Sequence, residues 1–313
     1  MATPAASSTA RLRELFGKVL LAILAPTLLL GLLEGVARVG LERRSIYHGQ
    51  PLDCMRRSRL LGYEYVPHCR PRVSDTPFET NSLGLRDREV EEDGAHRILA
   101  IGDSCTWGWR VPQEAAYPQV LQRLLDARYG PRRYRTINAG APGRTSYHGL
   151  LYLRDQGLAL RPSIVIAAYS YNDSLPSGDA EEDLAFRHRM YPLLLLDDYL
   201  LDHAMIWGWL RNVQRPEQPT NLPRRVVPEK FERNLRDVVS LARDHGAAPL
   251  LVNLSPSARD GYSVAMRTLE RELGVPLVNY QGDRMDLVHP TREGYEELAA
   301  SVLERLETSG YVH

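Results

Sequence analysis

From His96 to the end of the chain, apolar runs bounded by turn residues alternate with helical patterns, and this alternation constrains the fold most strongly. The apolar runs are continuous, which is typical of strands buried on both faces of a parallel sheet. The predicted strands are 98–101, 134–138, 164–169, 249–253 and 277–280, and the predicted helices are 117–127, 146–158, 228–245, 263–273 and one after Pro290. The sequence therefore predicts a five-stranded parallel sheet covered by helices.

One stretch breaks this rhythm. Residues 175–225 contain an acidic start at 179–183 and an apolar block at 191–201, so we interpret them as an insertion. A long insertion at the carboxyl edge of a parallel sheet is commonly a lid or a substrate-binding element. A helical hairpin that only packs on the core is the alternative.

The N-terminus contains an export or anchoring signal. Residues 19–33 are uncharged and rich in leucine, and they follow Arg11, Arg13 and Lys18. A spanning helix needs about 20 apolar residues, and the apolar character extends over 15–39. We favour an uncleaved signal anchor at 15–39 behind a cytoplasmic N-terminus at 1–14, with the rest of the chain on the periplasmic side of a bacterial inner membrane. Secretion after cleavage of this segment is the alternative.

Residues 40–95 lack a sustained period of two or 3.6 and are rich in Arg, Pro, Gly and Ser, so we interpret them as a linker and pre-domain segment that partly packs onto a main domain at 96–313.

The chain has three cysteines. Cys54 and Cys69 either form a disulfide outside the cytoplasm or remain two free thiols, and Cys105 is left unpaired. Their spacing indicates no metal site, and no cofactor motif occurs. Basic and acidic residues both total 39, which disfavours a nucleic-acid partner.

A candidate nucleophile follows the first predicted strand. Ser104 ends the sequence Ile101-Gly102-Asp103-Ser104, where a strand gives way to a helix. This turn exposes a hydroxyl at the carboxyl edge of the sheet, and the helix N-terminus offers N–H groups to a developing oxyanion. A helix cap would also explain the same residues.

Partners for this serine lie just before the last helix. Asp286 precedes His289 by three residues, so its carboxylate can orient the imidazole and stabilise the imidazolium. Two further strand ends contain Gly140, followed by Gly143, and Asn172. A glycine amide and an asparagine side chain can both donate to a tetrahedral oxyanion.

Together these four blocks resemble the SGNH or GDSL-type hydrolases. Gly102-Asp103-Ser104 is similar to the first block, Gly140 to the second, Asn172-Asp173 to the third, and Asp286 with His289 to the last. The resemblance runs from about 96 to 307 and implies a flavodoxin-like three-layer α/β/α fold. It implies Ser104, Asp286 and His289 as a catalytic triad, and Ser104, Gly140 and Asn172 as the oxyanion hole, without a metal or cofactor.

The resemblance also has departures and an upstream extension. Cys105 stands where the family often has an aromatic or aliphatic residue, and Ser170 replaces a frequent glycine. The segment 81–86, Asn-Ser-Leu-Gly-Leu-Arg, looks like one that precedes the first block in membrane-anchored bacterial members. These features bear on the substrate pocket and on the architecture, whereas every catalytic group is retained.

The predicted function is that of a serine esterase acting on an ester of a lipid, a glycan or a small molecule. An O-acyltransferase with the same triad is one alternative, because access to the pocket determines whether water or another alcohol accepts the acyl group. A non-catalytic binding module on the same fold is the other. The intact triad disfavours this last alternative.

Overall fold

The computed structural model describes residues 8–40, 54–58, 61–70, 72–73, 76–92, 94–176, 223–255, 257 and 259–313, together with 200, 204 and 206–207. The chain divides into two units, one formed by residues 1–44 and 190–217 and the other by residues 45–189 and 218–313. Each unit is described by itself. Most of the insertion predicted at 175–225 lies outside the described residues.

A five-stranded sheet forms the centre of the second unit. Its strands are β5 (His96–Gly102), β6 (Tyr134–Gly140), β7 (Ile164–Ala168), β8 (Ala248–Asn253) and β9 (Leu277–Asn279). Their order is β6-β5-β7-β8-β9, and every neighbouring pair is parallel. The predicted five-stranded parallel sheet is therefore confirmed. Because the connection reverses direction after β6, the carboxyl ends of β5, β6 and β7 lie side by side at a switch point, where ligands bind in such folds.

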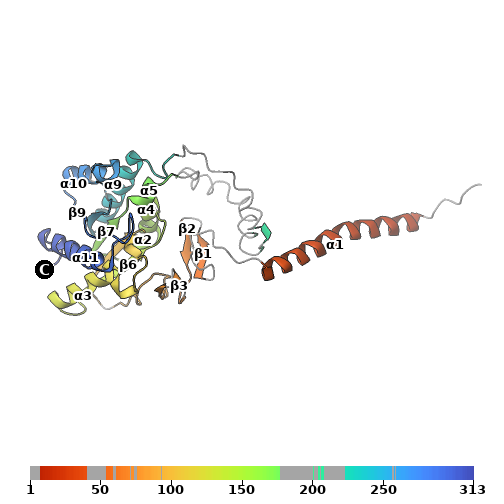
Figure 1. Ribbon diagram of the computed structural model, residues 1–313, viewed down its shortest axis with the longest axis horizontal. Coiled ribbons are helices and arrows are strands. Elements are labelled where there is room, and N and C mark those ends of the chain that lie inside the picture. The colour runs from red at the N-terminus through yellow and green to blue at the C-terminus, as the bar shows by residue number, and fades with distance from the viewer. Residues whose placement is uncertain are drawn as a thin grey trace, which may run out of the picture. The chain divides into compact units, whose positions relative to one another are not determined.

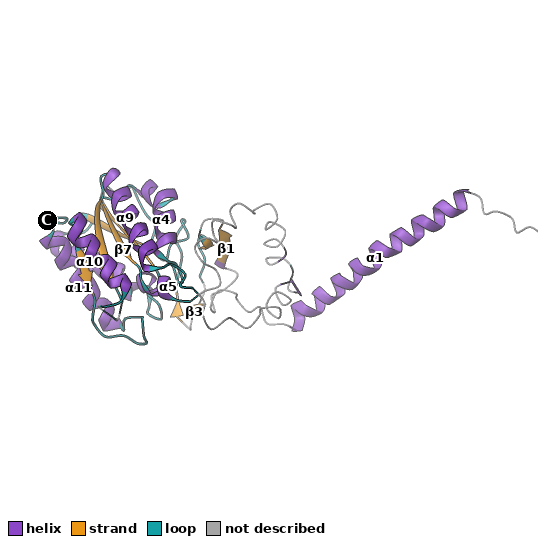
Figure 2. Ribbon diagram, turned by 90° about the horizontal axis from the view of Figure 1, so that it is seen from above, coloured by secondary structure: helices purple, strands orange, loops and turns teal. Residues whose placement is uncertain are grey.

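Helices cover both faces of this sheet (Figure 1, Figure 2). One face carries α3 (Tyr117–Tyr129) and α11 (Arg292–Thr308), and the other carries α4 (Ser146–Asp155), α9 (Pro228–Asp244) and α10 (Gly261–Leu273). Each face of the sheet has its own hydrophobic core, and strand β5 contributes to both. Ile98 and Ala100 lie in the core under α3 and α11, and Leu99 and Ile101 lie in the core under α4, α9 and α10. Both faces of the strand are thus buried, which explains its continuous apolar run.

Shorter elements stand at the ends of the strands. They are α2 (Ser104–Trp107), α5 (Tyr171–Ser174) and two 3₁₀ turns at Gln113–Ala115 and Gly157–Leu160. Helix α2 is capped by Asp103, whose carboxylate accepts the Cys105 N–H, and it ends at Gly108 in the left-handed region. This capping places the start of α2 directly at the carboxyl end of β5.

The pre-domain segment forms two small antiparallel pairs. These are β1 (Met55–Ser58) with β2 (Gly62–Tyr65), and β3 (Arg72–Val73) with β4 (Thr76–Pro77). A disulfide joins Cys54 to Cys69 with Cα atoms 5.7 Å apart, whereas Cys105 is a buried free thiol. Of the two alternatives that the sequence leaves open for Cys54 and Cys69, the structure therefore has the bond.

The same segment contributes to the buried interior of the domain. Tyr63, Tyr65 and Phe78 pack against Trp107 of α2 and against Ala141, which follows β6. The Phe78 and Trp107 rings meet edge to face with centroids 4.8 Å apart, and the Tyr65 ring stacks on Trp107 at 6.1 Å. These contacts join the pre-domain segment to α2, the helix that begins at Ser104.

The first unit contains α1 (Ser8–Gly40), an apolar N-terminal helix. Its stretch Arg13–Val39 is 27 residues long and is apolar enough to cross a membrane by length and composition. At 1.5 Å per residue it exceeds the roughly 30 Å of a bilayer core. A membrane anchor and a signal sequence both have these properties.

Candidate active site

Two hydrogen-bond contacts link three side chains predicted from the sequence in a row. Ser104 Oγ is 2.8 Å from His289 Nε2, and His289 Nδ1 is 2.8 Å from Asp286 Oδ2. Ser104 stands at the start of α2 and is buried, with 8% of its surface exposed. The imidazole thus bridges a hydroxyl and a carboxylate, and its contact with Ser104 joins residues 185 apart in sequence.

The turn that carries the histidine is built by its own aspartate. Asp286 Oδ1 accepts the backbone N–H groups of Val288 and His289, both at 2.8 Å, while its second oxygen holds the imidazole. Burial opposes ionisation of this carboxyl, yet these hydrogen bonds prevail and lower the pKa of Asp286. The turn is closed by the Met285 N–H, which donates to the His289 carbonyl at 2.8 Å.

The residue after the serine packs against the histidine turn. Cys105 is fully buried, and its thiol lies 3.8 Å from the carbonyl oxygen of Val288. Both residues belong to one core cluster with Tyr295 of α11. A small side chain at position 105 therefore permits close contact between α2 and the turn of His289, which gives a structural role to this departure from the family pattern.

Asn172 lies beside the nucleophile turn. Its Nδ2 donates to Asp103 Oδ2 at 3.3 Å and to the Arg144 carbonyl at 3.2 Å, both near the upper limit for a hydrogen bond. Complete burial raises the pKa of Asp103 to about 6. The amide of Asn172 is therefore held between the residue before Ser104 and the loop after β6.

Gly140 has a different environment from the one expected for an oxyanion donor. Its N–H donates to Asn138 Oδ1 at 3.0 Å, so this donor is already satisfied inside the protein. A Cβ at this position would lie only 2.4 Å from the Trp107 backbone nitrogen. Gly140 therefore permits close packing of β6 against α2, and the structure does not support the predicted role of its amide.

Two backbone N–H groups at the carboxyl ends of β5 and β6 have no partner within the described part of the chain. They are the amides of Ser104 and of Gly143, and Gly143 has a left-handed φ of 76°. The loop of Gly143 is fixed on both sides, since the Ala141 N–H donates to the Gly102 carbonyl at 3.1 Å and the Arg144 carbonyl accepts from Asn172. The resemblance in sequence implies Gly140 as the donor, and Gly143 stands three residues further on.

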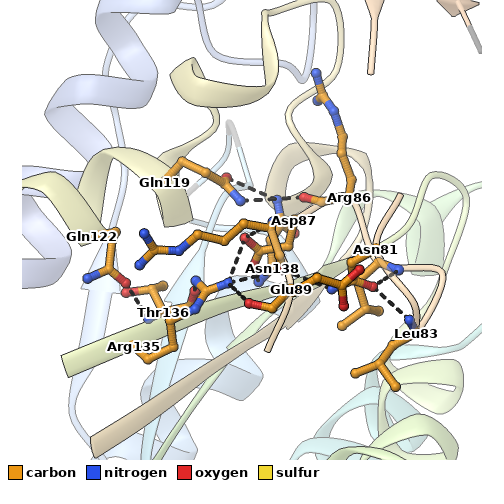
Figure 3. A network of polar contacts seen from close by, with 12 residues as sticks. Asn81, Leu83, Arg86, Asp87, Glu89, Gln119, Gln122, Arg135, Thr136 and Asn138 are labelled. Carbon is orange, nitrogen blue, oxygen red and sulfur yellow. Dashed lines mark hydrogen bonds and ion pairs between the residues drawn. The ribbon is translucent and has the colours of Figure 1, made fainter. Parts of the chain in front are cut away.

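A polar network attaches the segment 81–89 to β6 (Figure 3). Asp87 accepts the Asn138 N–H at 2.8 Å and is paired with Arg135 at 3.1 Å, and all three residues are buried. Burial raises the pKa of Asp87, which the Arg135 guanidinium and the Asn138 N–H oppose. Asn81 shapes the segment, because its Oδ1 accepts the N–H groups of Leu83 and Leu85.

The described residues contain no group of three or more His, Cys, Asp or Glu side chains arranged to hold a metal ion.

Asp173 follows Asn172 directly and is a buried acid, whose carboxylate accepts the N–H and the hydroxyl of Ser146. Burial raises the pKa of Asp173 to about 7.

The family model described as GDSL-like Lipase/Acylhydrolase matches residues 100–297, which is well over half of the chain. The chain belongs to this family. It therefore carries a GDSL-like hydrolase domain, and the fold predicted from the resemblance agrees with the observed sheet and its covering helices. No curated protein matches the chain in sequence.

Several solved structures are similar to this GDSL-like hydrolase. The crystal structure of TesA is 20% identical, with a TM-score of 0.47 over 68% of this chain and 99% of that chain. The esterase EstA from Pseudoalteromonas sp. is 16% identical, with a TM-score of 0.46 over 69% and 100% of the two chains. The acetyl-xylooligosaccharide esterase Axe2 from Geobacillus is 18% identical, with a TM-score of 0.45 over 67% and 94%.

Proposed function

We propose that the protein is a serine esterase in which Ser104 is the nucleophile, His289 the general base and acid, and Asp286 the residue that orients His289. The observation that supports this proposal is the continuous set of contacts from Ser104 Oγ through the imidazole to Asp286, each 2.8 Å long. A hydroxyl is activated when a base lies within about 2.6–3.2 Å and is itself oriented by a third group.

The reaction follows from these contacts. Ser104 Oγ attacks the ester carbonyl while its proton moves to His289 Nε2, and the tetrahedral intermediate collapses when His289 returns that proton to the leaving alcohol. Water then attacks the acyl-enzyme, again giving a proton to His289, and a carboxylic acid and the free serine are released. Asp286 remains ionised throughout and stabilises the imidazolium.

We infer that the oxyanion is bound by the amides of Ser104 and Gly143 and by the side chain of Asn172. The two amides have no other acceptor among the described residues. Asn172 Nδ2 has two acceptors, Asp103 Oδ2 at 3.3 Å and the Arg144 carbonyl at 3.2 Å, and both contacts are long, so this amide can turn toward a developing oxyanion. This assignment replaces Gly140 with Gly143. Each donor aimed at the oxyanion contributes typically 100- to 1,000-fold to kcat, by order of magnitude.

We further propose that α1 anchors the hydrolase domain outside the cytoplasm. The length and composition of Arg13–Val39 support an anchor. The bond between Cys54 and Cys69 supports an oxidising compartment, since disulfides are rare in the cytoplasm. The ester substrate would then be a lipid, a glycan or a small molecule that reaches the outer side of the membrane.

Hydrolysis of p-nitrophenyl acetate, butyrate and octanoate by the full-length chain in detergent tests the proposal. Ser104→Ala and His289→Ala are expected to abolish a clear wild-type rate, whereas the exposed control His245→Ala retains it. Full activity in Ser104→Ala would contradict the assignment. Wild-type consumption of the ester that depends on an added sugar or alcohol, with no release of free acid, would instead favour an acyltransferase.

A further inference from the structure

A buried arginine lies beneath the turn that follows the candidate nucleophile. Arg86 is 1% exposed, and its guanidinium carbon is 4.2 Å from the centre of the Trp107 ring. Its Nη1 donates to the Trp107 and Gly108 carbonyls at 2.8 and 2.5 Å, and its Nη2 donates to the Val111 carbonyl at 2.7 Å. One planar side chain thus holds three carbonyls of a single turn.

This turn has an unusual backbone. Gly108 and Arg110 adopt left-handed φ values of 91° and 57°. For a residue other than glycine this conformation costs roughly 1–2 kcal/mol, so it requires support from its surroundings. Inward-facing carbonyls must also find donors when they are buried. Arg86 supplies those donors, and lysine, which presents a point charge, lacks the same planar fork.

The arginine is itself held in position from the other side. The neighbouring Asp87 is fixed to β6 through Asn138 and Arg135, while the side chain of Arg86 leaves this network in another direction (Figure 3). Burial lowers the pKa of Arg86 to about 10, so the guanidinium remains charged at neutral pH. The segment 81–87 lies before residues 100–297, which the family model matches, so its part in the site is additional to the family match.

The supported turn carries an aromatic ring to the candidate base. Trp109 stacks on the imidazole of His289, with ring centroids 5.7 Å apart and an interplanar angle of 27°. The same imidazole must present Nε2 to Ser104 and Nδ1 to Asp286 at once. A flat ring against one of its faces restricts rotation out of the plane that contains both hydrogen bonds.

We propose that Arg86 and Trp109 are positioning residues for the esterase reaction. Arg86 fixes the turn 107–111, and this turn holds the Trp109 ring against His289. The proposal rests on the proposed function, in which His289 transfers protons to and from Ser104. A small misplacement of a reacting group costs a large factor in rate because the reaction proceeds only from well-aligned conformers.

The effect is expected in kcat and not in KM for a small ester, since neither residue is required to contact an acetyl group. Trp109→Leu removes the flat ring and is expected to lower kcat roughly tenfold, with KM for p-nitrophenyl acetate changed less than about twofold. Trp109→Phe keeps a flat ring and is expected to restore at least half of the lost rate. Arg86→Lys is expected to lower kcat by a factor similar to that of Trp109→Leu.

The experiment compares these variants with the wild type as the full-length chain in detergent, with circular dichroism as the check of folding. Arg97→Lys is the matched control, because Arg97 is 7% exposed and donates to two backbone carbonyls, Glu91 and Leu160, but lies near the amino end of β5. Its kcat is expected to equal that of the wild type.

Wild-type kcat in Trp109→Leu would overturn the proposal, and so would a loss that appears only in KM or a Phe variant no better than Leu. The Trp109→Leu and Trp109→Phe variants decide the proposal even if Arg86→Lys fails to fold, because their measurement does not depend on that variant. Failure of the proposed function is distinguished by the serine variant: if Ser104→Ala is as active as the wild type, the esterase assignment fails whatever the Trp109 variants do.

Discussion

Replacing Gly140 with alanine is expected to displace the helix that carries the nucleophile. The added Cβ would lie 2.4 Å from the Trp107 nitrogen and 2.8 Å from the Thr106 carbonyl carbon, whereas ordinary contact begins at 3.4 Å. Both neighbours are backbone atoms of α2, so relief requires a shift of about 1 Å in that helix or in the end of β6. Since α2 begins at Ser104, the shift separates Oγ from His289 Nε2.

The magnitude follows from that displacement. A 1 Å misplacement of a reacting group costs roughly 100-fold in rate, and overpacking of this kind destabilises a fold by about 1–3 kcal/mol. We therefore expect kcat of Gly140→Ala to fall about 100-fold while the protein remains folded.

Steady-state hydrolysis of p-nitrophenyl acetate and urea unfolding together measure both effects. Gly157→Ala serves as the control, because its Cβ would meet side-chain atoms and no backbone: the flexible ends of Leu99 and Leu153 at 3.0 and 3.3 Å and the Tyr152 ring at 3.4 Å. The control is expected to keep the wild-type kcat. If folded Gly140→Ala keeps kcat within about twofold of the wild type, the close packing of β6 on α2 does not position Ser104 and the reasoning is refuted.

Three further outcomes are expected. Burial raises the pKa of Asp173 from 3.8 to about 7, so the folded state holds this proton more tightly and the free energy of unfolding falls as the pH rises between those values. In urea titrations the free energy of unfolding of Asp173→Asn should exceed that of the wild type by up to about 4 kcal/mol near pH 8 and equal it near pH 4, and a difference independent of pH would contradict this. Replacing Cys54 and Cys69 with serine should lower the free energy of unfolding by about 2–3 kcal/mol for a loop of 15 residues, and added reductant should then have no further effect, as thermal denaturation will reveal. Gly143→Ala keeps the backbone N–H and its Cβ meets no atom within 4 Å, but the residue is strained at φ 76°. Relief of this strain should turn the N–H away from the oxyanion and lower kcat roughly tenfold or more, with at most about 2 kcal/mol lost in stability; an unchanged kcat would contradict this displacement of the N–H.

The sheet was predictable because its strands are buried on both faces. Ile98 to Ile101 form a continuous apolar run, and such runs followed by helices leave few alternatives to a parallel sheet. The candidate triad was also accessible from sequence, since Ser104 directly follows the end of β5 and His289 stands just before α11, with the Gly-Asp-Ser and Asp-x-x-His patterns at these two places.

The contribution of residues 54–92 was not predictable in the same way. Arg86 and Asp87 are buried through contacts with residues 107–111 and with Asn138, which are distant in sequence, so no local period marks them. The only sequence signal was the looser resemblance of the segment 81–86 to that of anchored family members. The environment of Gly140 was missed for another reason, because a motif match does not reveal that the Asn138 side chain already accepts its N–H.

Covalent labelling with a fluorophosphonate, followed by peptide mass spectrometry of the full-length chain, tests the central assignment most directly. Such reagents phosphonylate an activated serine, so we expect a single adduct on Ser104 that forms in the wild type, is absent in Ser104→Ala and forms much more slowly in His289→Ala. An adduct on another residue that accompanies loss of activity, or labelling of Ser104 at the same rate without His289, would contradict the account.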